Sequence, residues 1–347
     1  MKHLKLFSAL DISRNTSFRS GEIKFGERLQ ILEQTEDWAE ELAKQDSKYA
    51  ILGIPEDIGV RANMGRAGAA SAWDNFIKSF LNIQHNRFCK AHRITLVGHL
   101  DFEKELQEAA NLQIENKEDR KKLFELVAKI DKEVTHIISL IVKAKKIPII
   151  IGGGHNNAYG NIKGTALGKG KCINAINFDA HTDFRALEGR HSGNGFSYAL
   201  EEGFLKNYFI FGLHENYTSK SVFSSIKEKQ EQVKFNTYEQ IQIRKDKSFE
   251  TELLAAKEHV DTNFFGIEID LDAIPLIASS AITPTGFSTE QLRQFLYFFG
   301  RSKNAAYLHI CEGAPSLDSD KNPNLVGKLI SYLVTDFIKA NSEKTIF

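Results

Sequence analysis

From about residue 48 onward, short apolar runs alternate with longer stretches in which apolar residues recur every three or four positions. The short runs suit strands buried on both faces, and the longer stretches suit amphipathic helices. This alternation predicts an α/β fold with a parallel sheet whose strands are joined by crossover helices. The expected strands are residues 49–54, 93–97, 147–151, 173–178, 208–213, 264–270 and 306–311, and the clearest expected helices are residues 117–144, 289–300 and 325–340.

The 347 residues show no Pro/Gly/Ser-rich linker, no low-complexity run and no internal repeat that would mark several domains. We therefore expect one domain over residues 47–347, preceded by an accessory N-terminal segment, residues 1–46. Residues 27–44 are charged and compatible with a helix, so we expect an accessory helix there with an irregular lead-in.

Composition excludes several classes of partner. Lys and Arg number 45 and so do Asp and Glu, which leaves no electrostatic footprint for nucleic acid or an acidic membrane. The best candidate for a membrane span, residues 137–151, is short and interrupted by lysines. Cys89, Cys172 and Cys311 are too few for a disulfide framework, and the N-terminus lacks the apolar run of a secretory signal. We expect a cytoplasmic protein with a small-molecule partner.

Residue types that bind metals gather where three of the expected strands end, the place where open α/β sheets hold their ligands. They are His155 after three glycines, then Asp179, His181 and Asp183, and finally Glu268, Asp270 and Asp272. Alternate positions on an extended segment point to one side, so each group can face a common centre. Carboxylates this numerous would repel one another in a small buried volume unless cations compensated them.

Each motif alone has an ordinary explanation: a turn with a surface histidine, a solvated loop, or the polar face of an edge strand. Three such strand ends along one α/β chain are hard to obtain by chance, so the conjunction predicts a metal site. Imidazoles and carboxylates without a thiolate favour manganese, with zinc, iron or nickel as competitors. Six ligands exceed the need of one tetrahedral ion, so we expect two Mn²⁺ ions per subunit, with a bridging carboxylate and hydroxide.

The three motifs resemble the metal motifs of the ureohydrolase family, which contains arginase, agmatinase and formimidoylglutamase and hydrolyses carbon–nitrogen bonds of linear amidines and guanidines. The resemblance covers about residues 48–340. It implies a three-layer αβα fold with a central parallel, mostly eight-stranded sheet, and assembly as a trimer or hexamer. The metal ligands that it implies are His155 and Asp183 for one manganese ion, His181 and Asp272 for the other, and Asp179 and Asp270 between the two.

The third motif allows a second alignment, in which Glu268 and Asp270 take the places of the family's two aspartates. We prefer Asp270 and Asp272, because Pro275 then stands as in formimidoylglutamases. This choice leaves Glu268 where other members have a small residue, as an outer-shell or structural carboxylate.

A fourth motif, residues 309–315, resembles the family segment whose glutamate pairs with the cationic end of the substrate, and this implies that role for Glu312. A fixed anion would hold the planar cation beside the nucleophile. The alternative is a surface glutamate at a strand end. The resemblance further implies attack by the metal-bridging hydroxide, whose proton Asp183 orients.

Substrate selection must come from residues other than the metal ligands. The candidates are Arg185, Arg190, His191, Ser192 and Asn194 in the loop after Asp183, and Glu215 at a later strand end, which resembles the residue holding a substrate's α-amino group in arginase. The arginines would suit a dicarboxylate substrate, or they could be ordinary surface ion pairs. Phe196 stands where arginases and agmatinases have a shuttle histidine, a departure shared with formimidoylglutamases.

The preferred function is hydrolysis of N-formimidoyl-L-glutamate in histidine degradation. The alternative is an arginase-like or other guanidino-acid hydrolase that releases urea, favoured by Ser192, Asn194 and Glu215 and disfavoured by Phe196. A catalytically silent metal-binding member is a second alternative, disfavoured because all six expected ligands are present.

Overall fold

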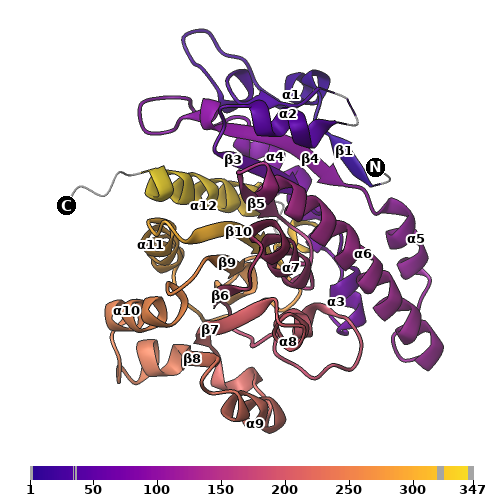
Figure 1. The fold of residues 1–347 in the computed structure, drawn as a ribbon, viewed down its shortest axis with the longest axis vertical. Helices are drawn as coiled ribbons and strands as arrows, with labels where there is room; N and C mark the ends of the chain where they lie inside the picture. Colours follow the sequence, from indigo (N-terminus) through magenta and orange to yellow (C-terminus); the bar gives the residue numbers. More distant parts are fainter. Residues whose placement is uncertain (1–2, 34, 36, 319–323, 343–347) are drawn as a thin grey trace.

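The computed structural model describes residues 3–33, 35, 37–318 and 324–342. Within them, ten strands form one sheet in the order β1-β4-β3-β5-β10-β9-β6-β7-β8, with β2 also paired to β4 (Figure 1). The strands are β1 (Leu4–Leu6), β2 (Gln30–Ile31), β3 (Tyr49–Gly53), β4 (Ile94–Leu100), β5 (Ile147–Ile151), β6 (Ile173–Phe178), β7 (Leu205–Leu213), β8 (Val233–Thr237), β9 (Phe265–Asp270) and β10 (Ala305–Cys311). Among the strands of the described residues, β1 pairs antiparallel with β4, and all other strand pairs are parallel.

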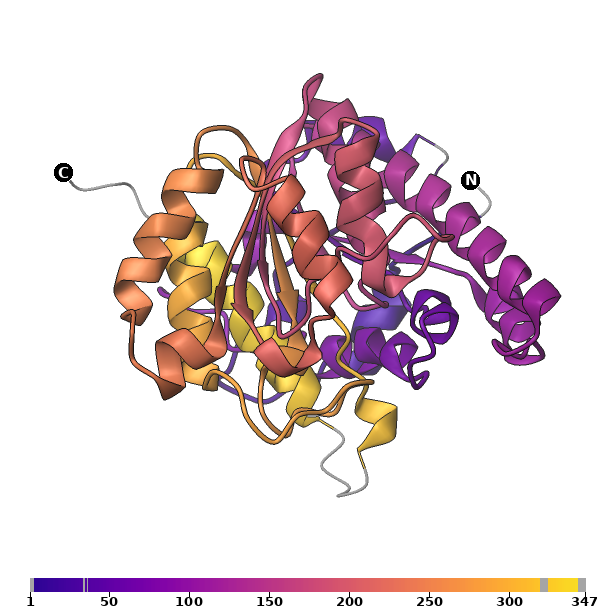
Figure 2. The same ribbon diagram turned by 90° about the horizontal axis from the view of Figure 1, so that it is seen from below.

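Helices cover both faces of the sheet and make the three expected layers (Figures 1 and 2). One apolar core packs α4, α10, α11 and α12 against the sheet, and the other packs α2, α3, α6, α7 and α8 against the opposite face. The helices are α1 (Ala9–Asn15), α2 (Trp38–Lys44), α3 (Ile58–Ala62), α4 (Ala72–Phe80), α5 (Glu103–Ala110), α6 (Lys117–Lys143), α7 (Asn157–Lys169), α8 (Gly195–Glu201), α9 (Lys220–Glu228), α10 (Phe249–Val260), α11 (Thr289–Gly300) and α12 (Leu325–Ser342).

All seven expected strands and all three clearest helices are present, within a few residues of the expected bounds. The sheet has ten strands rather than the eight expected from the resemblance, and β1, β2 and β8 are the three that were not among the seven strands expected from the sequence. β1 and β2 have three and two residues, too few for a period-two pattern to show.

The accessory helix expected at residues 27–44 is mostly absent in the described part of this range. Glu27 closes a 3₁₀ turn, Gln30 and Ile31 form β2, and only Trp38–Lys44 is helical. The pairing of Gln30 and Ile31 with β4 supplies backbone hydrogen bonds to a segment whose charge pattern also allowed a helix.

A stripe of glycines lets α7 lie close against α6. A Cβ at Gly160 would lie 2.7 Å from Val134 Cγ1, and one at Gly164 would lie 2.7 Å from the carbonyl oxygen of Thr135. Because His155 directly precedes Asn156, the N-cap of α7, this close packing also helps to position that histidine.

The metal-type motifs follow the central strands β5, β6 and β9, and β10 lies between β5 and β9. These strands are parallel, so their carboxyl ends meet at one edge of the sheet. None of the helices in the described ranges is both long and apolar enough to cross a membrane.

Candidate metal centre and substrate cavity

His155 reaches the centre of this edge through the glycine turn after β5. Gly152 and Gly153 have φ angles of 83° and 78°, in the left-handed region that favours glycine. A Cβ at Gly153 would also lie 2.7 Å from the carbonyl oxygen of Ile54. The turn therefore needs glycine, and it delivers the imidazole at the start of α7.

The six expected metal ligands converge in two groups that share one carboxylate. His155, Asp179, Asp183 and Asp270 form the first group, and Asp179, His181 and Asp272 form the second. In the first, His155 Nδ1 lies 2.7 Å from Asp183 Oδ2 and 3.2 Å from Asp270 Oδ2. In the second, His181 Nδ1 lies 3.2 Å from Asp272 Oδ2 and 3.5 Å from Asp179 Oδ1. Asp179 thus lies between the two groups.

The electrostatics of the two groups fit cations. Burial, with Asp272 and Asp179 nearby, raises the pKa of Asp270 well above its usual range. Asp272 raises the pKa of His181 well above its ordinary value, against the effect of burial. Both ring nitrogens of His155 and one oxygen of Asp272 are buried without a hydrogen-bond partner among the described residues. Hard divalent ions would neutralise the carboxylates and engage Nδ1 of His155 and the unpaired oxygen of Asp272, so the residues present fit two such ions.

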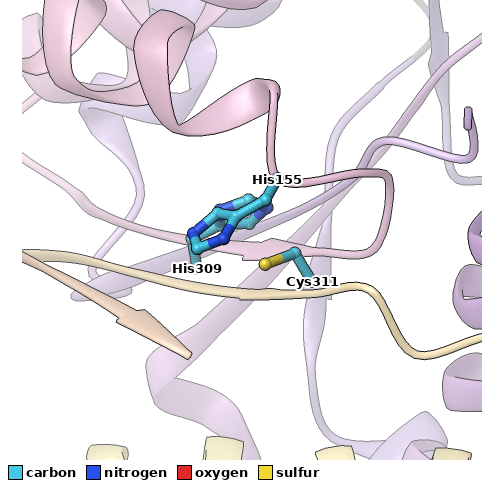
Figure 3. A group of neighbouring side chains, drawn as sticks. All are labelled: His155, His309 and Cys311. Carbon is cyan, nitrogen blue, oxygen red and sulfur yellow. The ribbon is translucent and has the colours of Figure 1, made fainter. Parts of the chain in front are cut away.

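Glu268, which we expect from the sequence to be an outer-shell or structural carboxylate, is completely buried in β9 beside this centre. Its carboxylate accepts hydrogen bonds from Tyr307 Oη at 2.6 Å and His309 Nδ1 at 2.5 Å, both on β10. Burial alone would raise the pKa of Glu268, but His309 and His155 lower it to about 2. Figure 3 shows His155 over His309, with the thiol of Cys311 beside the two rings.

Glu312 lies at the end of β10, and its Oε1 accepts a hydrogen bond of 2.8 Å from the backbone N–H of His155. Burial and the nearby Asp272 raise the pKa of Glu312 to about 8. Glu312 and Asp183 have φ angles of 59° and 44°, which are uncommon for residues with a side chain. Such conformations concentrate at functional sites, where the surrounding structure holds them in place.

A cavity of about 690 Å³ opens over the centre, and four of the six expected ligands line it, whereas His155 and Asp179 are buried beneath the lining. Asp183, Asp270, Asp272 and Glu312 line its floor, together with His181. Its walls include Asn63, Arg66, Arg185, Glu188, Ser192 and Tyr217. The cavity lining therefore combines the carboxylates of the centre and Glu312 with two arginines, Arg66 and Arg185.

Of the six residues expected to select the substrate besides Glu312, Arg185 and Ser192 line this cavity. Arg185 donates to Asn63 Oδ1 and Glu188 Oε1, and Ser192 Oγ accepts from Asn63 Nδ2. These two side chains are placed to meet a ligand.

Arg190 lies elsewhere, which corrects the expectation from the sequence. Its guanidinium is buried against α6, where Nε donates to Asp131 Oδ2 at 2.8 Å. The rings of Tyr159 and Tyr198 each lie 5.0 Å from the guanidinium carbon and meet each other edge to face at 6.4 Å. Arg190 therefore forms an ion pair with Asp131 of α6 instead of facing the cavity. No sequence pattern predicts this pairing.

Glu215, Asn194 and His191 also lie outside the cavity lining. Glu215 is bound by Arg244, which donates to both of its carboxylate oxygens. Asn194 and His191 hold the loop in shape: Asn194 Nδ2 donates to the carbonyl of Gly189, and His191 Nδ1 accepts from the backbone N–H of Gly193. We infer that the three residues position the loop and the strand end rather than contact a ligand.

Tyr217 and Glu188 line the cavity and were not expected from the sequence. The ring of Tyr217 lies 5.8 Å from that of His181. The only sequence signal for Tyr217 was its place shortly after an expected strand, but most aromatic residues at such places merely pack against their neighbours. Phe196 packs too: it is buried, stacks 4.2 Å from Tyr208 and meets His155 edge-on at 5.3 Å.

Comparisons with known proteins agree with this geometry. Residues 47–335 match the sequence model of the arginase family. Formimidoylglutamase of Hahella chejuensis is 29% identical over 50% of this chain and 49% of its own length, and that of Geobacillus sp. WCH70 is 26% identical over 80% and 79%.

Two solved structures share the fold. Formimidoylglutamase of Bacillus subtilis superposes with a TM-score of 0.73 at 18% identity, covering 93% of this chain and 94% of that one. Formiminoglutamase of Trypanosoma cruzi with Mn²⁺ gives 0.68 at 18% identity, covering 92% and 98%. The family match spans most of the chain and includes every residue of the two ligand groups. The chain therefore belongs to the arginase family.

Proposed function

We propose that the protein is a binuclear manganese hydrolase that cleaves N-formimidoyl-L-glutamate into glutamate and formamide. The observation that carries this proposal is the convergence of two histidines and four aspartates in two groups that share Asp179. The curated relatives named formimidoylglutamase, and the manganese in the T. cruzi structure, support the choice of substrate and metal.

In this proposal His155, Asp179, Asp183 and Asp270 hold one ion, and His181, Asp272 and the shared Asp179 hold the other. When bound, the two ions supply Lewis acidity and lower the pKa of water. Asp183 lies at the cavity floor, where its carboxylate can take the proton of the attacking water. That proton then passes to the departing amine of glutamate as the carbon–nitrogen bond breaks.

Glu312 orients the substrate. Its carboxylate faces the cavity while the backbone N–H of His155 fixes Oε1, so it can pair with the planar formimidoyl cation. Substrate binding brings a positive charge to this carboxylate and thereby favours its ionised form. At the cavity wall, Arg185 can bind a carboxylate of the glutamyl part.

The arginase-like alternative required Glu215 to hold an α-amino group. Because Arg244 occupies both oxygens of Glu215, the geometry supports the formimidoyl substrate better. We extend the proposal to a homo-oligomer, a trimer or hexamer as in the family resemblance, which sedimentation of the purified protein would test.

The test is a side-by-side assay of the manganese-loaded protein on N-formimidoyl-L-glutamate, arginine, agmatine and guanidinobutyrate. We expect formamide and glutamate from the first and no urea from the others. Asp270→Asn is the control, because it removes one charge from the metal centre and should abolish turnover. Urea from a guanidino compound, without formamide from the first substrate, would overturn the choice of substrate.

A further inference from the structure

Glu268 stands at the centre of a buried polar cluster that the chemistry proposed above does not use. In the pairing of β9 with β10, Glu268 lies opposite His309, and Gly266 lies opposite Tyr307. A Cβ at Gly266 would lie 2.1 Å from the Tyr307 ring, so only glycine leaves room for the phenol to reach Glu268. Gly266, Tyr307 and His309 are thus built around one carboxylate.

Besides Tyr307 and His309, the Glu268 carboxylate also contacts His155, a proposed metal ligand. Glu268 Oε2 lies 3.5 Å from His155 Nε2, the ring nitrogen opposite the one that faces Asp183 and Asp270. The thiol of Cys311 also lies beside the His155 ring (Figure 3). It donates a hydrogen bond to the carbonyl oxygen of Ile269 at 3.5 Å. His309 is held by Glu268 through Nδ1.

A neutral imidazole carries its proton on one nitrogen and offers a lone pair on the other. Histidines that ligate metals almost always present the remaining N–H to a carboxylate, carbonyl or water, which sets the tautomer and the ring orientation. Glu268 is the anion nearest to Nε2 among the contacts of His155, so it favours the proton at Nε2 and leaves Nδ1 free to bind a cation.

We propose that Glu268 is a positioning residue for His155, and that it tunes the affinity of the manganese site containing His155 without touching the site containing His181. This inference rests on the metal centre of the proposed function. Tyr307 and His309 serve to hold the carboxylate in place, because each donates to it and neither hydrogen bond involves a proposed ligand.

Glu268→Gln tests the proposal, because it keeps the shape but removes the charge beside Nε2. Tyr307→Phe is the matched control: it disturbs the same carboxylate, in the same buried cluster, at the oxygen away from His155. Manganese binding would be measured by calorimetric titration of each purified protein, and site occupancy by anomalous diffraction from crystals grown at limiting Mn²⁺.

We expect two ions per chain in the wild type and in Tyr307→Phe. In Glu268→Gln, one ion should bind about 10- to 100-fold more weakly, and the lost anomalous peak should be the one beside His155. Equal affinities in Glu268→Gln and wild type, or equal losses in both variants, would overturn the inference. Failure of the wild type itself to bind two ions would instead overturn the proposed function. If Glu268→Gln does not fold, Glu268→Asp provides the same test. Its side chain is one methylene shorter, so its charge lies farther from His155, and we again expect weaker binding of the ion beside His155.

Discussion

Replacing Arg190 with Met separates a structural role from contact with the substrate. The Arg190 residue is 6% exposed, and its guanidinium is paired with the buried Asp131. Removing one partner of a buried ion pair leaves the other charge uncompensated, which costs about 3–5 kcal/mol. Unfolding entropy near Tm is about 2.1 cal/mol/K per residue, so this loss would lower Tm of the 347-residue chain by about 4–7 °C.

The stability lost in Arg190→Met should increase as the pH rises. Burial already raises the pKa of Asp131, and Arg190 restrains the rise. Without Arg190 the folded variant holds a proton on Asp131 that the unfolded chain releases at neutral pH. Stability of the variant therefore falls relative to wild type as pH rises, by at most about 1.4 kcal/mol per pH unit.

The assay is thermal unfolding followed by circular dichroism at pH 6 and pH 8, with steady-state kinetics on the same samples. Asp131→Leu in the same chain should restore most of the stability lost in Arg190→Met, because no unpaired charge remains. An unchanged Tm together with a higher KM would refute this reasoning and return Arg190 to the substrate site.

Three further outcomes are expected. Glu312→Gln should retain two manganese ions in a metal assay but lower kcat at least about 100-fold, since an amide cannot pair with the cationic amidine; unchanged kcat would remove Glu312 from the mechanism. Chelation of the metals should lower Tm, and free Mn²⁺ at 100 times its Kd should restore about 2.7 kcal/mol, as calorimetric scans would show; a Tm independent of Mn²⁺ would contradict the site. Gly164→Ala should destabilise the protein by about 1–3 kcal/mol in denaturant titration, because its Cβ would meet the Thr135 carbonyl; a fully stable variant would refute the close packing of α6 and α7.

The class of fold and the candidate metal ligands could be predicted from the amino-acid sequence alone. Parallel strands buried on both faces must be apolar throughout, so runs such as Ile147–Ile151 are visible without a structure. Ligands at alternate positions after β6 and β9 are local in sequence, and the carboxyl ends of parallel strands share one edge. The local residue pattern and the common direction of the strands were therefore sufficient to predict the strands and the edge of the sheet where these ligands gather.

The polar residues that face the cavity could not be predicted from the sequence, because their positions depend on how distant segments pack. Arg185 and Arg190 are five positions apart in one loop, yet one lines the cavity and the other is buried against Asp131 on α6. Glu268 acquires its partners because β10 lies next to β9 in the sheet, although they are separated along the chain by α11. Pairings between distant segments depend on how the layers pack, and a buried charge binds whichever partner that packing brings within reach.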